Sequence, residues 1–166
     1  MVVKPGIAHG SLNIEFNLPS KSGYLKHLAK DDNRRRHAGY FAFLYDWCWG
    51  ADPQWLYDVR DQHRIYTFDH GHFLGGCKFP RVEWTPTALE AYTDSDTSFW
   101  NDANGIDAKE LFRIADCIES VSTDDLIDVL AMIPLEWPVE TSELEAVGEF
   151  LLKRGPAVAA RLRKLA

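Results

Sequence analysis

The residues best suited to chemistry lie in one stretch of the chain, from position 46 to position 72. Polar side chains that can hold a metal or move a proton stand at both of its ends: Asp46, Asp52 and Gln54 first, then Asp69, His70 and His72. Carboxylate and amide oxygens are ligands that Mg²⁺ prefers. Phosphoryl transfer uses this combination, because one carboxylate orients the attacking hydroxyl while others hold the metal on the phosphates. The stretch therefore indicates a magnesium-dependent, kinase-like site.

A β-hairpin is predicted between these two groups of polar residues. Residues 55–57 and 65–68 are rich in aromatic and β-branched side chains, and the polar residues 58–64 separate them. A hairpin returns the chain to the place that it left. We therefore expect the acids that precede the first strand to lie near Asp69, which follows the second.

A buried helix is predicted before the hairpin. From Arg34 onward, apolar side chains recur at helical spacings and give one broad apolar face. The helix should run to about Trp49, because Gly50 and Pro53 stop it. After the hairpin, one short helix is expected over residues 87–92.

Further helices should follow in the C-terminal part of the chain. Asp107, with a glutamate three residues later, predicts the start of a helix that ends near residue 120. Ser122 or Thr123 can cap a second helix, which Pro134 ends.

The last part of the chain is predicted to hold two more helices. One should begin at Thr141 or Ser142 and end at Gly155, where Pro156 suits the first turn of a final basic helix. Acidic residues dominate positions 107–149 before that basic end. We expect these charges to mark solvated helix faces rather than a docking surface.

The elements together define a fold class. Residues 1–33 are rich in Gly, Pro, Ser and Asn and should be irregular, apart from an edge strand near Leu12, Ile14 and Phe16. Residues 1–166 should form a single domain of the α+β class, mostly helical, in which a helical bundle carries one β-hairpin.

The composition excludes several functional classes. With 166 residues, 46% of them hydrophobic, the chain can bury one sizeable core. Its net charge of -7 argues against a nucleic-acid partner, because phosphate contacts need a positive field. The three cysteines show no CxxC pattern, which fits a reducing cytoplasm. No signal core and no run of eighteen apolar residues is found, so we expect a cytoplasmic protein without a membrane segment.

The second predicted strand carries a family resemblance. It reads Tyr66, Thr67, Phe68, Asp69, His70, Gly71. This stretch resembles the HipA-like kinase family, in particular its small members, whose C-terminal lobe carries a hydrophobic strand ending in Asp-His-Gly. The resemblance runs from about His9 to the C-terminus. It implies a kinase C-lobe-like helical bundle, a magnesium ligand at Asp69, and contacts from Gln54, His70 and Gly71 to the cofactor.

The resemblance leaves two registers open for the catalytic loop. The family places a metal-binding Asn five residues after the catalytic Asp, but Ala51 stands five residues after Asp46. In one register, Asp46 is the base and Asp52 takes the metal role. In the other, Asp52 is the key acid and Gln54 replaces the Asn.

The resemblance also implies a nucleotide-binding N-terminal lobe. No glycine-rich loop or strand lysine of the kinase type precedes the first predicted helix. We therefore expect a degenerate binding or regulatory protein that acts through contacts with another protein. One alternative is a kinase subunit completed by another chain, which would phosphorylate a protein with ATP and magnesium. Another is a metal-dependent hydrolase that uses Asp69, His70 and His72.

Overall fold

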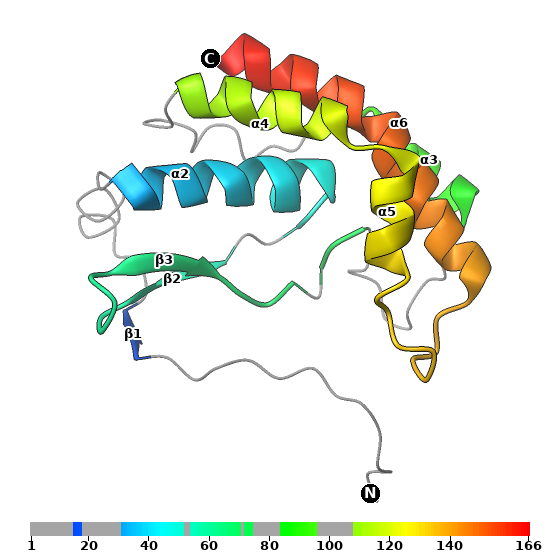
Figure 1. Ribbon diagram of the computed structural model, residues 1–166, viewed down its shortest axis with the longest axis horizontal. Coiled ribbons are helices and arrows are strands. Elements are labelled where there is room, and N and C mark those ends of the chain that lie inside the picture. Colours follow the sequence, from blue (N-terminus) through cyan, green and yellow to red (C-terminus); the bar gives the residue numbers. More distant parts are fainter. Residues whose placement is uncertain (1–14, 18–30, 52–53, 71, 75–83, 96–107) are drawn as a thin grey trace, which may run out of the picture.

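The computed structural model describes residues 15–17, 31–51, 54–70, 72–74, 84–95 and 108–166. More of its residues lie in helices than in strands, so the prediction of a mostly helical α+β fold is confirmed. Figure 1 shows the β-hairpin below a long N-terminal helix, with two further long helices lying across the other side of that helix. The elements, in chain order, are β1 (Phe16–Asn17), α2 (Asp31–Gly39), η1 (Tyr40–Trp47), β2 (Trp55–Asp58), β3 (Arg64–Thr67), α3 (Pro86–Thr93), α4 (Ala108–Ser120), α5 (Thr123–Leu130) and α6 (Thr141–Leu165).

The predicted hairpin is present, and its register is antiparallel. Trp55 pairs with Thr67 at the open end, and Asp58 pairs with Arg64 beside the turn. The short strand β1 adds a third strand, since Phe16 pairs with Asp58. The predicted edge strand is thus found in part, whereas residues 12 and 14 lie outside the described residues.

Buried Asn33 connects the hairpin to α2. Its side-chain amide donates to the carbonyl of His63 at 2.8 Å, and its side-chain oxygen accepts from the Ile65 N–H at 2.9 Å. Tyr40, the first residue of η1, donates from its hydroxyl to the Ile65 carbonyl at 3.2 Å. These bonds satisfy hairpin backbone groups that would otherwise be buried without partners. They fix the position of β3 on the helix.

The helix before the hairpin differs in its bounds from the prediction. It begins at Asp31, earlier than Arg34, and its second half has the wider π-helical winding up to Trp47. Trp49 lies outside it, with a positive φ of 47°. The next residue, Gly50, is closely packed, because a Cβ there would lie 2.4 Å from the Phe73 ring.

The C-terminal helices pack into one core. The buried side chains of Ile114 and Ile118 on α4 belong to the same apolar cluster as Val158 and Leu162 on α6. Ser122 caps α5, since its hydroxyl accepts from the Asp125 N–H at 3.2 Å. The predicted end of α4 near residue 120 and the predicted cap of α5 are therefore correct, whereas the predicted start at Asp107 lies outside the described residues.

The prediction of two separate helices after Thr141 is wrong. One helix, α6, runs from Thr141 to Leu165, with Gly155 and Pro156 inside it. Gly155 lies close to α4, since a Cβ there would meet Ile118 Cγ2 at 3.4 Å, in van der Waals contact. An internal proline costs a helix about 3 kcal/mol. Burying the apolar side chains beyond it offsets that cost, at roughly 1.5–3 kcal/mol for each Val or Leu.

Candidate functional site

A network of hydroxyl groups holds the base of the hairpin. The N–H of Gln54, just before β2, donates to Tyr45 Oη at 3.0 Å. The same Tyr45 oxygen lies 2.8 Å from Thr67 Oγ1 at the end of β3, and Thr67 Oγ1 lies 3.0 Å from the Gln54 carbonyl. Tyr45 is buried in η1. The network therefore fixes the start of one strand and the end of the other against a rigid helix.

This arrangement brings three of the predicted site residues together. Gln54 Nε2 donates to Asp69 Oδ2 at 3.4 Å. His70 Nε2 lies 3.1 Å from Thr67 Oγ1, and its ring lies edge-on to Phe73 at 5.1 Å. The backbone of Asp69 has a φ of 53°, a left-handed conformation that Asp tolerates better than most residues. The turn thus presents an exposed carboxylate and an amide side by side at the hairpin base.

The imidazole of His70 is held by neighbouring residues of the hairpin base. Burial lowers the pKa of its imidazole, and the nearby Asp69 carboxylate opposes that shift. One ring nitrogen, Nε2, is engaged with Thr67. Nδ1 of His72 is buried and has no hydrogen-bond partner in the described part of the chain. Over the described ranges, no group of three or more His, Cys, Asp or Glu side chains is placed to hold a metal ion.

Asp46 is placed differently from Asp69. Its side chain is 1% exposed, and its partners are two arginines of α6. Arg154 Nη2 and Arg161 Nη2 each donate to Asp46 Oδ1 at 2.7 Å, and Arg161 Nε donates to Oδ2 at 3.2 Å. Both carboxylate oxygens therefore have cationic partners. The expectation that Asp46 faces the hairpin base with Asp69 needs correction, since its carboxylate is directed to α6 instead.

Arg154 extends this ion pair to a third element. It donates from Nε to the Asp46 carbonyl at 2.8 Å and from Nη1 to the carbonyls of Tyr92 and Thr93 at the end of α3. Arg154 is fully buried. Its guanidinium thus connects η1, α3 and α6 in the interior of the bundle.

The sequence contained a signal for this pairing that its motifs did not reveal. Arg154 lies on the apolar stripe of α6, three residues after Leu151 and four before Val158. Asp46 lies between the buried residues Tyr45 and Trp47. A charged residue on a buried stripe needs an opposite charge. Two buried residues of opposite charge are therefore expected to pair, even when they lie 108 positions apart.

Two predicted site residues, Asp52 and Gly71, lie outside the described residues.

Comparison of the chain with protein-family models, curated proteins and solved structures finds no significant match. None of the helices described by the structure is both long enough and apolar enough to cross a membrane.

Proposed function

We propose that the chain is a protein-binding module on a kinase-like helical lobe, and that it transfers no phosphate by itself. The observation that carries the proposal is the pairing of buried Asp46 with Arg154 and Arg161. A general base must come within hydrogen-bond reach of the proton that it removes. Asp46 is shielded from solvent, and both of its oxygens accept from guanidinium groups.

A structural role accounts for Asp46 better than a catalytic one. Breaking a buried ion pair by removing one partner typically costs 3–5 kcal/mol, roughly, because a charge remains buried without compensation. The pair connects helices that are distant in sequence. It therefore favours one arrangement of the bundle, which is what a binding scaffold requires.

The HipA-like resemblance is consistent with this proposal in a second respect. Phosphoryl transfer depends on positioning and on neutralising charge at the phosphates. On this proposal the Asp-His-Gly turn is retained for its hydrogen bonds at the hairpin base.

One observation favours a second candidate, a magnesium-dependent phosphotransferase completed by another chain. Gln54 and Asp69 lie within 3.4 Å of each other at an exposed position. Rotating the Gln54 amide by half a turn would present its oxygen beside the Asp69 carboxylate, and two such oxygens suit Mg²⁺. In this candidate Asp52 is the acid that acts on the substrate.

Incubation of the purified chain with labelled ATP and Mg²⁺ tests the proposal. We expect no time-dependent labelling of the chain or of a generic protein substrate. Labelling that Asp69→Asn abolishes would overturn the proposal and support the second candidate. Asp61→Asn, which changes another hairpin carboxylate, in the turn between β2 and β3, is the matched control.

A further inference from the structure

One end of the molecule exposes several large apolar side chains. In the described part of the chain, most of the exposed large hydrophobic residues fall in one stretch, from α5 to the turns that lead into α6. We call them the α5 turn surface: Ile127, Val129, Met132, Leu135 and Trp137. Met132 is 80% exposed and Leu135 is 100% exposed. Apolar groups gathered in this way mark interaction sites more often than isolated ones do.

The backbone beneath this surface is held by hydrogen bonds. The N–H of Met132 donates to the Val129 carbonyl at 3.2 Å, and the N–H of Trp137 donates to the Pro134 carbonyl at 3.0 Å. Leu126 on α5 is buried in the core. Figure 1 shows these turns extending past α5 at one end of the molecule. The exposed side chains are therefore presented on a fixed frame, and binding them needs little ordering of this chain.

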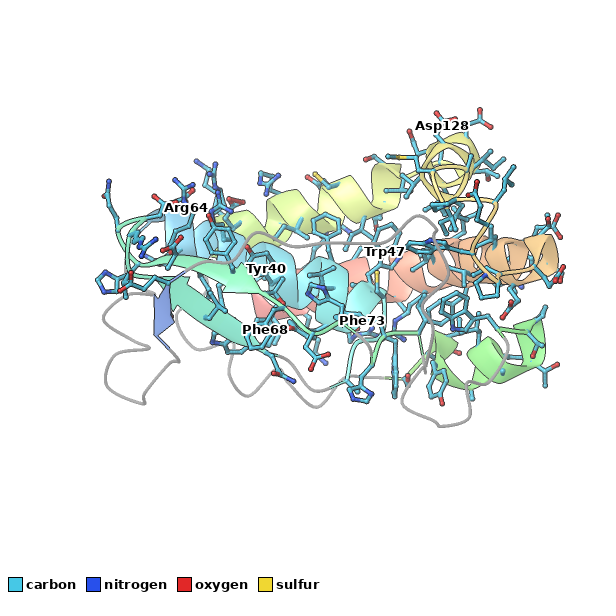
Figure 2. All side chains as sticks on the ribbon, turned by 90° about the horizontal axis from the view of Figure 1, so that it is seen from below. Tyr40, Trp47, Arg64, Phe68, Phe73 and Asp128 are labelled. Atoms are coloured by element: carbon cyan, nitrogen blue, oxygen red, sulfur yellow. The ribbon has the colours of Figure 1, made fainter. Side chains whose placement is uncertain are left out.

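The charge around the surface has one sign. Between Arg113 and Lys153 the sequence holds no Lys, Arg or His. Asp124, Asp128, Glu136 and Glu140 are exposed within or beside the α5 turn surface. Figure 2 shows Asp128 at the outer edge of α5, with its side chain pointing away from the other helices. The apolar side chains thus stand in a strongly negative field.

We propose that the α5 turn surface binds a positively charged amphipathic segment of another protein. This inference rests on the proposed protein-binding function and names the surface and the chemistry of its partner. Leucine-like side chains of the partner would cover Met132 and Leu135. Its lysines and arginines would lay their aliphatic stems on apolar surface and place their charges near the acids. Such charges set the rate of association and its dependence on salt.

The same charge argues against other occupants. A symmetric contact between two copies would place acid against acid, which opposes self-association through this surface. Anionic lipid and nucleic acid carry the same sign as the surface and would be repelled. The basic end of this chain is already engaged in part, since Arg163 is paired with Asp116 and Glu119.

Binding of a synthetic peptide to the full chain tests the proposal. The probe is a fluorescent peptide of leucine and lysine with helical spacing, about five turns long. One control peptide carries glutamate for lysine, and a second carries glutamine for leucine. We expect fluorescence anisotropy to report saturable binding of the first peptide alone, weakened by added salt. Equal binding of the glutamine peptide would show attraction by charge alone and would overturn the proposal.

Variants of the chain locate the binding site. The double variant Met132→Ser and Leu135→Ser removes apolar surface without changing charge, and we expect at least about tenfold weaker binding. Phe112→Ser, at a 46% exposed position on α4, is the matched control and should leave binding unchanged. Equal affinity of the wild type and the double variant would contradict the proposal. So would a concentration-dependent dimer that the double variant dissolves, because the occupant would then be a second copy.

The two proposals fail in different experiments. If the peptide does not bind and no phosphate is transferred, only the proposal for the α5 turn surface is wrong. Phosphate transfer from ATP would overturn the proposed non-catalytic function, whether or not the peptide binds.

Discussion

Arg154 Nη2 donates to Asp46 Oδ1 at 2.7 Å, in an ion pair whose side chains are 0% and 1% exposed. The two residues come from the last helix and from the helix before the hairpin. Desolvation makes such a pair a weak source of net stability but a strong constraint on which helices pack together. The pair therefore explains why Asp46 of η1 lies in the core.

The two arginines that bind Asp46 should differ in their contribution to stability. Arg154→Met removes a fully buried guanidinium that also binds the carbonyls of Tyr92 and Thr93. We expect its free energy of unfolding to fall by about 3–5 kcal/mol. Arg161→Met should cost less, because Arg161 is 19% exposed and Arg154 would still compensate Asp46. Urea unfolding measures both, and an equal loss for the two variants would contradict this ranking.

Two glycines of the helices should respond to substitution in opposite directions. At Gly39 nothing lies within 4 Å of an added Cβ, and the backbone is helical. Gly39→Ala should therefore raise the free energy of unfolding by about 0.5–1 kcal/mol. Gly155→Val should lower it by about 1–3 kcal/mol, because the larger side chain would push against Ile118. Thermal unfolding of the two variants checks the signs, and stabilisation by Gly155→Val would show that α4 and α6 are not closely packed there.

His37 should make the stability of the fold depend on pH. Burial lowers the pKa of its imidazole from 6.5 to about 4, and the ring packs against Phe41 and Trp55. Between these values the unfolded chain binds a proton that the folded chain does not. The free energy of unfolding should therefore fall as pH falls below 6.5, by up to about 3 kcal/mol, and level off below about 4.

A variant isolates this effect from other groups. In His37→Gln, much of the fall in unfolding free energy between about pH 7 and about pH 4.5 should disappear. His70→Gln is the control, because its imidazole is exposed whereas that of His37 is buried. An unchanged slope in His37→Gln would show that other groups govern the acid sensitivity.

Local features of this fold were predictable from the sequence. The hairpin follows from two short aromatic and β-branched runs, and the start of α5 follows from the capping residue Ser122. These signals act over a few residues. The wrong prediction of a helix end at Gly155 and Pro156 has the opposite origin, because a glycine followed by a proline is locally typical of a helix end. The packing of Gly155 beside Ile118 and Trp47, far away in sequence, is not visible in that local pattern.

The candidate site was predictable only in part for the same reason. A hairpin predicts that Gln54 and Asp69 return to one place, and the structure places them within 3.4 Å. The partners of Asp46 lie 108 and 115 positions away, and no local motif indicates them. The exposure of Leu135 was equally hidden, because an apolar residue in a turn carries no periodic pattern.

Asp46→Asn offers the most direct measurement of whether Asp46 holds helices together or accepts a proton. Labelled phosphate transfer from ATP with Mg²⁺ and the free energy of unfolding should be measured on the same samples of wild type and variant. We predict no labelling in either protein and a loss of stability of about 3–5 kcal/mol in the variant. The contrary result is a wild-type chain that incorporates label and an Asp46→Asn chain that stays equally stable but incorporates none.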